Sequence, residues 1–287
     1  MNKQLSIIIV TYNSEKLIFE CLESIYKYND IGDNLEIIVV DNCSKNCDNI
    51  FKKIQAEFSN DIRLIKSNHN HGYGAGNNLG NKYANSPYFV VMNPDVRIVE
   101  PIFNKILNIL RADLNIGLLG VKFIDGSNHL YYKPEYENLF NMIFGNTFIK
   151  LGFYNVEKMY FSGSFLVFNK EIFIESGGFD ENLFLFYEEA DISNRILGIK
   201  KKTLLANDLF VLHLIHGRAI NKNLLKIGIQ SRQYYFNKYN IDIDKYYKRS
   251  LIMWRLKYIA ASILFDSYRK EHFRQWINLC LRKGEVL

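Results

Sequence analysis

The sequence predicts an α/β fold in which a mostly parallel central sheet is flanked by helices and followed by a helical C-terminal extension. In the first hundred residues, short apolar and β-branched runs alternate with segments of helical periodicity, as in successive βαβ units. After about residue 220 the apolar residues recur at helical spacing and carry aromatic and basic neighbours. We therefore expect an α/β domain over residues 1–220 and a basic helical extension over residues 221–287.

Four short apolar runs are expected to form neighbouring strands of the sheet. They span residues 5–10, 35–40, 62–66 and 88–92. The first link has helical spacing, with Asn13 or Ser14 as the candidate N-cap, and a second helix is expected from about residue 47 to 58. Because βαβ units make these strands parallel, Tyr12 and Asp41 should lie at the same edge of the sheet.

The run at residues 88–92 ends in a rigid turn, Asn93-Pro94-Asp95. All five residues of this run are apolar, as in a strand that is buried on both faces. Ligands of open α/β sheets bind beyond the carboxyl ends of the strands, and hard cations such as Mg²⁺ and Mn²⁺ prefer oxygen ligands. Asp95 is therefore a candidate metal ligand, although an isolated Asn-Pro-Asp is more often a surface turn.

A glycine-rich segment, NHNHGYGAGNNLG, occupies residues 68–80. Its spacing is GxGxG rather than GxGxxG and it follows the third strand, so it does not predict a dinucleotide site. The segment also lacks the GK[ST] of a nucleotide-triphosphate loop. Gly74 would allow a ligand to approach the backbone, and Asn77 and Asn78 could hydrogen-bond it. A purely structural turn is the equal alternative.

Charge is divided unevenly along the 287 residues. Residues 1–199 carry 18 Lys and Arg against 24 Asp and Glu, whereas residues 200–287 carry 18 against 6. The excess of positive charge suggests an anionic partner for the C-terminal end, either a membrane surface or a polyanion. A solvated pair of basic helices, packed on the main domain or on a second subunit, would give the same composition.

Three features indicate a folded cytoplasmic protein. Hydrophobic residues make up 48% of the chain and there are only 4 Pro, so we expect order throughout. The four cysteines show neither zinc-site nor CxxC spacing, which favours free thiols in a reducing compartment. The apolar run at residues 5–10 is too short for the core of a signal peptide, and no window of 18 residues is apolar and uncharged.

Four motifs, IIIVTYNS, IIVVDNCS, NHNHGYGAGNNLG and VVMNPDV, together resemble the nucleotide-sugar half of family-2 glycosyltransferases with the GT-A fold. The resemblance implies that Thr11, Tyr12 and Asn13 belong to the nucleotide-sugar site, where the Tyr12 ring stacks on the nucleotide base. It also implies that Asp41 binds the base or ribose. Asp95 matches the last carboxylate of the family's DxD metal motif. Asn93 replaces its first Asp, as in the rhamnosyltransferase-like branch, which implies weaker metal binding or a smaller role for the metal.

The second half of the chain is similar to the acceptor half of the same family. Residues 161–168, FSGSFLVF, are expected to form a strand entered through Gly163, and residues 175–195 match the signature GGFDExFFxYxEDxDLxxR almost throughout. The family's catalytic Asp falls at Glu189, with Glu188 and Asp191 beside it on the acceptor side. Crowded carboxylates should raise one pKa toward neutrality, as a general base requires. Asp191 is the alternative base, and a helix start with acidic residues is the structural alternative.

His213 follows a strand-like run at residues 208–212, and His216-Gly217 resembles the family's late His-x-x-Gly region. The resemblance implies that either His213 or His216 supplies a further metal ligand or contacts the diphosphate. A structural histidine is the alternative at both positions.

The resemblance implies an inverting hexosyl- or deoxyhexosyltransferase. It would bind its donor with residues 1–100 and its acceptor with residues 101–220, and would move a sugar from dTDP-rhamnose or a UDP-sugar to a hydroxyl of a growing bacterial cell-surface glycan, free or lipid-linked. Glu189 would remove the hydroxyl proton, while Asp95 and Mg²⁺ or Mn²⁺ would hold the departing nucleoside diphosphate. We expect a cytoplasmic enzyme, peripheral at the inner face of the plasma membrane, with no nucleic-acid partner and with homodimerisation left open.

Two other classes are kept as alternatives. A nucleotidyltransferase of related fold also uses carboxylate-bound Mg²⁺, but it needs a glycine-rich basic loop directly after the first strand, where this chain has Thr11-Tyr12-Asn13-Ser14. A non-catalytic glycan- or membrane-binding protein could have kept the fold. Release of nucleoside diphosphate from a donor sugar would distinguish an enzyme from such a protein.

Overall fold

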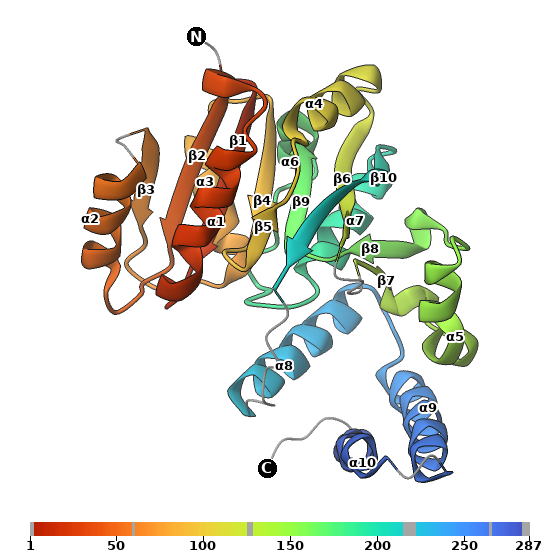
Figure 1. Ribbon diagram of the computed structural model, residues 1–287. Coiled ribbons are helices and arrows are strands. Elements are labelled where there is room, and N and C mark those ends of the chain that lie inside the picture. Colours follow the sequence, from red (N-terminus) through yellow and green to blue (C-terminus); the bar gives the residue numbers. More distant parts are fainter. Residues whose placement is uncertain (1–2, 59–60, 125–128, 215–221, 264–265, 283–287) are drawn as a thin grey trace. The chain divides into compact units, whose positions relative to one another are not determined.

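The computed structural model describes residues 3–58, 61–124, 129–214, 222–263 and 266–282 (Figure 1). The chain forms two compact units. The first contains residues 1–131 and 160–217, and the second combines residues 132–159 with residues 218–287. The sequence-based division near residue 220 assigns residues 132–159 to the acceptor half, whereas in the structure this insertion belongs with the C-terminal helices.

An eight-stranded sheet in the order β3-β2-β1-β4-β9-β6-β10-β5 forms the centre of the first unit. Its parallel half consists of β1 (Leu5–Thr11), β2 (Leu35–Asp41), β3 (Ile62–Lys66) and β4 (Tyr88–Met92). The other half consists of β5 (Val96–Ile98), β6 (Ile116–Phe123), β9 (Phe165–Asn169) and β10 (Lys202–His213). Four of the seven pairings between these described strands are parallel, which confirms the expected mostly parallel sheet.

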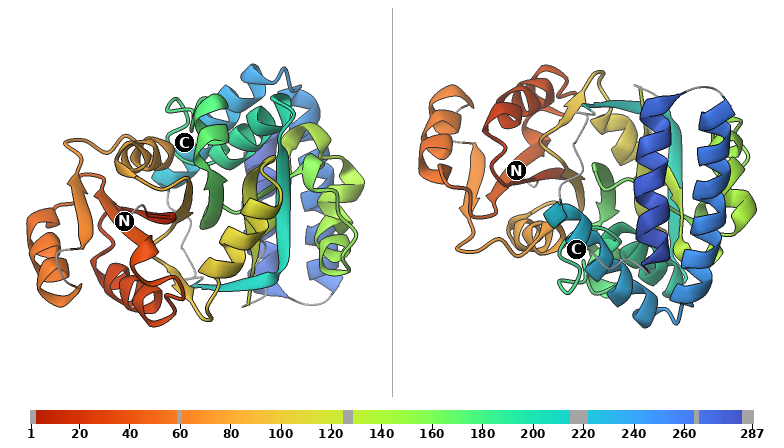
Figure 2. Two further views of the ribbon diagram at one scale, coloured as in Figure 1. Left: turned by 90° about the horizontal axis from the view of Figure 1, so that it is seen from above. Right: turned by 90° about the horizontal axis from the view of Figure 1, so that it is seen from below.

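Helices cover both faces of the sheet (Figure 2). One face carries α1 (Glu15–Lys27), α2 (Cys47–Phe58) and α4 (Phe103–Ala112), whose apolar stripes join the main core cluster. The other carries α3 (Tyr73–Tyr83), α6 (Lys170–Glu175) and α7 (Glu188–Gly198). Because both faces are covered, the central strand β4 is apolar and buried along its whole length instead of alternating with polar residues.

The second unit is helical. It contains α5 (Leu139–Lys150), α8 (Lys222–Lys238), α9 (Ile243–Ile263) and α10 (Ser267–Leu281). The rings of Trp254 on α9 and Trp276 on α10 stack with their centroids 5.5 Å apart. Among the described residues, no helix combines the length and the apolar character that a membrane span needs.

Short elements complete the fold. Single turns of 3₁₀ helix lie at Gly32–Asn34, Pro134–Tyr136 and Val156–Lys158, and β7 (Leu130–Tyr132) pairs with β8 (Met159–Phe161) in a separate two-stranded sheet. In the inserted segment, Lys133 is fully buried and its Nζ donates a 2.9 Å hydrogen bond to the Glu157 carbonyl. Burial lowers the pKa of Lys133 to about 8. The lysine thus fixes the two ends of the insertion to each other.

Candidate active site

β1 and β2 end side by side, and the carboxylate of Asp41 holds the turns that follow the two strands. Thr11 and Asp41 are register partners in the two parallel strands. Asp41 is fully buried, and its Oδ2 accepts a 3.1 Å hydrogen bond from Thr11 Oγ1 while its Oδ1 accepts a 2.7 Å bond from the Ser44 N–H. In this structure Asp41 therefore fixes the turn, and it presents no carboxylate to solvent for a nucleotide.

Beside this turn, Tyr12 is presented to solvent. The backbone of Asn13 adopts a left-handed φ of 51°, which Asn tolerates better than most residues. The Asn13 N–H donates a 2.8 Å hydrogen bond to Ser44 Oγ, and Asn13 Oδ1 accepts one of 3.3 Å from the Lys45 N–H. The Tyr12 side chain is 53% exposed. An exposed aromatic ring on a rigid turn at a strand end provides a surface on which a nucleotide base can stack.

The glycine-rich segment serves close packing, and a helix begins inside it at Tyr73 rather than after it. A Cβ added at Gly76 would lie 2.8 Å from Val10 Cγ1, and one at Gly74 would lie 2.9 Å from Phe179 Cβ. Both distances are shorter than side-chain contacts allow, so α3 approaches β1 and the loop before α7 only because these positions lack a side chain. The space beside Gly74 is thus filled by Phe179.

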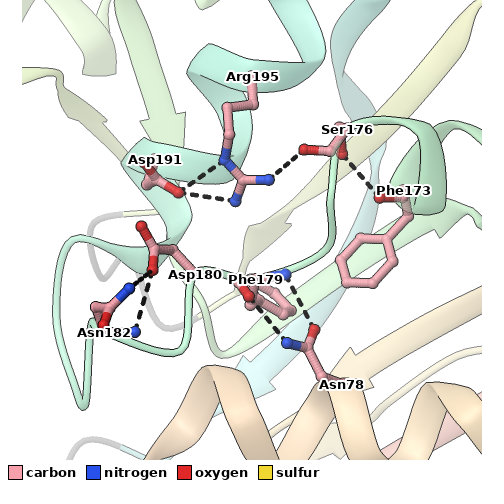
Figure 3. Close-up of polar contacts among 8 residues, drawn as sticks. All are labelled: Asn78, Phe173, Ser176, Phe179, Asp180, Asn182, Asp191 and Arg195. Carbon is pink, nitrogen blue, oxygen red and sulfur yellow. Dashed lines mark hydrogen bonds and ion pairs between the residues drawn. The ribbon is translucent and has the colours of Figure 1, made fainter. Parts of the chain in front are cut away.

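The amides of Asn77 and Asn78 are engaged by the chain itself. Asn78 Oδ1 accepts a 3.0 Å hydrogen bond from the Phe179 N–H, and its Nδ2 donates one of 2.9 Å to the Phe179 carbonyl (Figure 3). Asn78 Nδ2 also donates a 2.9 Å bond to Glu181 Oε1. Asn77 is fully buried, and its Nδ2 donates a 2.9 Å bond to the Tyr73 carbonyl. Instead of reaching toward a nucleotide, Asn78 holds the backbone of the GGFDE segment on α3.

The turn after β4 brings Asp95 beside the end of β10. Arg97 is buried, and its Nη1 donates a 2.7 Å hydrogen bond to the Pro94 carbonyl, which fixes the shape of the turn. His213 Nε2 lies 3.6 Å from Asp95 Oδ2 and 3.2 Å from Ser164 Oγ. A carboxylate oxygen and an imidazole nitrogen, 118 residues apart in sequence, thus face each other at the carboxyl edge of the sheet.

This pair fits a divalent cation that completes its coordination with ligands from outside the chain. Oxygen from Asp95 and nitrogen from His213 are both ordinary ligands of divalent metals, and their separation lets both reach one ion. Among the described residues, no group of three or more His, Cys, Asp or Glu side chains could enclose a metal. Asn93 is anchored by its backbone N–H, which donates a 2.9 Å bond to the Ser164 carbonyl. His216, the other expected ligand, lies outside the described residues.

The first turn of α7 carries two neighbouring carboxyl groups in a buried setting. The helix is entered through Phe186 and Tyr187, whose left-handed φ angles of 73° and 71° are unusual for large side chains. Glu188 is 2% exposed, and burial together with the charge of Glu189 raises its pKa well above the usual value. Burial raises the pKa of Glu189 to about 7, although hydrogen bonds from its own N–H and at Gly163 act in the opposite direction.

The acids Glu188, Glu189 and Asp191 differ in their surroundings. Glu188 and Glu189 are adjacent in this turn, and the negative charge of Glu189 opposes ionisation of the buried Glu188 carboxyl group. Asp191 is fully buried and bound to Arg195, whose Nε and Nη2 lie 2.9 and 2.7 Å from Asp191 Oδ2 (Figure 3). Arg195 also donates through Nη1 to the Ser176 carbonyl, so this ion pair fixes α7 to the preceding loop.

Sequence reasoning gave no role to Tyr73, Asn42 or Ser164. The Tyr73 hydroxyl donates a hydrogen bond to the Gly163 carbonyl, and burial raises its pKa well above the usual value. Asn42 is buried, and its Nδ2 donates a 2.9 Å bond to the Gly72 carbonyl. A bulky residue inside a glycine run and an Asn after a strand-ending Asp were the available signals, but their partners are 28 to 90 residues away.

The sheet order, the motifs at its carboxyl edge and the acidic start of α7 together define a glycosyltransferase of the GT-A class. Residues 6–177 match the family model of glycosyl transferase family 2, and the chain belongs to that family. The expected family, fold and enzyme class are thereby confirmed. The rhamnosyltransferase-like branch stays a prediction.

Several known proteins are similar to this chain. It is 25% identical over 282 residues to the low-salt glycan biosynthesis hexosyltransferase Agl10 of Haloferax volcanii, covering 93% of this chain and 84% of that protein. The mannosyltransferase PcManGT from Pyrobaculum calidifontis, in complex with GDP-Man and Mn²⁺, has a similar fold with a TM-score of 0.66, 15% identity and coverage of 99% and 85%. S. aureus TarS 1-349 in complex with UDP has a TM-score of 0.57, 14% identity and coverage of 99% and 92%.

Proposed function

We propose that this protein is an inverting glycosyltransferase that moves a sugar from a nucleoside-diphosphate donor to a hydroxyl of a growing cell-surface glycan. The observation that carries the proposal is the Ser162-Gly163-Ser164 turn between β8 and β9. Ser164 contacts His213, the neighbour of Asp95, and Gly163 lies against the carboxylate of Glu189. The same turn therefore contacts both the proposed base, whose pKa is near neutrality, and one of the two proposed cation ligands.

On the donor side, the exposed ring of Tyr12 stacks on the base, and Thr11, Asn13 and Asp41 form the turn that holds it. The donor is dTDP-rhamnose or a UDP-sugar. The similar solved structures contain GDP-Man or UDP, which supports a nucleoside-diphosphate sugar as the class of donor. The side chains of Asn77 and Asn78 donate hydrogen bonds to backbone carbonyls of the chain itself. These two residues therefore shape the donor site through the backbone that they hold.

Asp95 and His213 would hold the cation, Mg²⁺ or Mn²⁺. When bound, the cation would offset the negative charge that develops on the departing nucleoside diphosphate. Because Asn93 is neutral, Asp95 supplies the only carboxylate of this turn, and the donor diphosphate must provide further oxygens. The Mn²⁺ in the PcManGT complex supports a divalent metal in this fold.

Glu189 accepts the proton of the acceptor hydroxyl as that oxygen attacks the anomeric carbon. Attack from the face opposite the leaving group in one displacement inverts the anomeric centre. Burial and the charge of Glu189 raise the pKa of Glu188, which favours the neutral form of Glu188 beside an ionised Glu189. Asp191 is committed to Arg195, so the alternative base is set aside.

The alternatives lack a supporting observation. β1 is followed by Tyr12, Asn13 and Ser14 and not by a basic glycine-rich loop, which disfavours a nucleotidyltransferase. The deciding experiment incubates the protein and Mn²⁺ with UDP-N-acetylglucosamine, GDP-mannose and dTDP-rhamnose, and measures released nucleoside diphosphate. Release from one donor above the others supports the proposal. No release from any donor, together with no binding of UDP, GDP or dTDP by calorimetry, would leave the non-catalytic class.

The second unit provides a surface for a bilayer. Four aliphatic side chains follow one face of α9, and they are Ile252, Leu256, Ile259 and Ile263, with 46, 46, 54 and 70% exposure. Helical spacing places Lys245 and Lys248 on the same face, toward the N-terminal end of α9. Helices α8, α9 and α10 carry twelve Lys and Arg against two Asp and Glu.

We assign this face of α9 to an anionic membrane, at the inner side of the plasma membrane. An aliphatic stripe bordered by lysines is the pattern of a helix that lies in the membrane interface. A second copy of the chain would bring like charges together, so charge complementarity favours lipid over a homodimer at this face. The first unit would then carry catalysis, and the second would carry attachment to the membrane that holds a lipid-linked acceptor.

A further inference from the structure

The Ser162-Gly163-Ser164 turn is held at each of its three residues. The Ser162 N–H donates a 3.0 Å hydrogen bond to the His129 carbonyl, and the Ser164 carbonyl accepts one of 2.9 Å from the Asn93 N–H. The Gly163 carbonyl between them accepts the hydrogen bond from the Tyr73 hydroxyl. The position of Gly163 is therefore fixed from both flanks and from α3.

Gly163 leaves space that the carboxylate of Glu189 occupies. A Cβ at this position would lie 2.2 Å from Glu189 Oε1 and 2.9 Å from its Cδ. The φ angle of Gly163 lies outside the left-handed region, so its conformation suits any L-residue and only the lack of space requires glycine. The nearest atoms are the end of a flexible side chain. An added methyl group would thus displace the carboxylate and leave the backbone in place.

Tyr73 is itself held rigidly where it meets the turn. Its backbone N–H donates a 2.9 Å hydrogen bond to the Phe184 carbonyl, and its ring packs edge-on against Phe179 at 6.2 Å between centroids. The preceding residue allows this approach, because a Cβ at Gly72 would lie 2.2 Å from the Phe184 carbonyl oxygen. Phe184 belongs to the loop that leads into α7. Tyr73 thereby joins the loop before Glu189 to the turn that receives its carboxylate.

We propose that Gly163 and Tyr73 are positioning residues for the general base. Gly163 has no Cβ, so the Glu189 carboxylate packs directly against its Cα, and the Tyr73 hydroxyl fixes the position of the Gly163 backbone by its hydrogen bond to the carbonyl. This inference rests on the proposed role of Glu189. The Gly163 backbone lies against the carboxylate, and the left-handed residues Phe186 and Tyr187 fix the start of the helix that carries Glu189. Holding a base in place in this way can contribute large factors to turnover without any effect on donor affinity.

The test places Gly163→Ala in two backgrounds, the wild type and Glu189→Asp. In the wild type we expect Gly163→Ala to lower kcat for donor hydrolysis about 10²-fold while the donor KM changes less than about twofold. An aspartate carboxylate is withdrawn by about 1.5 Å, so it does not collide with the added methyl. In the Glu189→Asp background the same substitution should therefore cost less than about threefold.

Two further variants separate positioning from general damage. Gly198→Ala adds the same methyl to the last residue of α7, where nothing lies within 4 Å, and should leave kcat and KM unchanged. Tyr73→Phe keeps the ring and removes only the hydroxyl, and should lower kcat about tenfold at constant donor KM.

Equal losses from Gly163→Ala in both backgrounds, or full activity of Gly163→Ala and Tyr73→Phe, would overturn the inference. Full activity of Glu189→Gln would instead overturn the proposed base itself. If Gly163→Ala does not fold, as judged by circular dichroism, Tyr73→Phe decides, and wild-type kcat in that variant overturns the inference.

Discussion

Replacing Glu189 by Gln should strongly lower catalysis and at the same time stabilise the protein. Burial raises the pKa of the Glu189 carboxyl from 4.5 to about 7. One pKa unit corresponds to about 1.4 kcal/mol, so the ionised carboxylate lowers the free energy of unfolding by about 3 kcal/mol. A neutral amide of the same shape removes this cost.

The sign of the effect with pH follows from the direction of the shift. Below about pH 4.5 the carboxyl is protonated in both the folded and the unfolded chain, so wild type and Glu189→Gln should be equally stable. Between about pH 4.5 and 7 the unfolded chain releases its proton first, and the wild type loses stability relative to the variant. Above about pH 7 the difference should stay constant at about 3 kcal/mol.

Activity should change in the opposite direction. A general base must be ionised, so wild-type kcat/KM should rise with pH to a plateau above about 7, whereas Glu189→Gln should be lower by about 10²- to 10⁴-fold and lack this rise. Urea unfolding followed by circular dichroism at pH 4.5, 6 and 8, combined with donor hydrolysis, measures both quantities. Glu57→Gln, on the exposed surface of α2, is the matched control. Normal turnover, or equal stability at pH 8, would refute the assignment of Glu189.

Three further predictions follow from the same geometry. Asp95→Ala should abolish the gain in UDP affinity that Mn²⁺ produces in calorimetry, because His213 alone cannot hold the cation, and an equal gain in both proteins would contradict the metal site. Asp191→Asn should lower the free energy of unfolding by about 3 kcal/mol, since it breaks the buried pair with Arg195, while kcat per folded molecule stays within about threefold; a stable but inactive protein would make Asp191 the base. The double variant Leu256→Ser and Ile259→Ser should weaken binding to phosphatidylglycerol vesicles about 10-fold or more, as each loses about 1 kcal/mol of apolar burial. Its control is Leu114→Ser, at a leucine of the first unit that is 65% exposed. Wild-type vesicle binding by the double variant, or a change in its oligomeric state on gel filtration, would exclude the bilayer as the partner of α9.

Much of the fold could be predicted because its signals are local. Five consecutive apolar residues predict the strand at residues 88–92, and helical spacing predicts the helix between the first two strands. Likewise, the candidate metal ligand Asp95 and the acidic start of α7 were identified from short motifs that match a family pattern. These features depend on residues that are neighbours in sequence, so burial period, turn chemistry and helix spacing reveal them.

The tertiary structure decided which of the candidates point at the site. Sequence alone gave three adjacent acids, and only the partner of each side chain distinguishes Asp191, which binds Arg195, from Glu189, whose carboxylate rests on Gly163. The amide of Asn78 meets Phe179, 101 residues later, and so changes from a candidate nucleotide contact to a structural clamp. Such contacts depend on which chain segments the sheet brings together, and that arrangement is set by packing across the whole domain rather than by any local pattern.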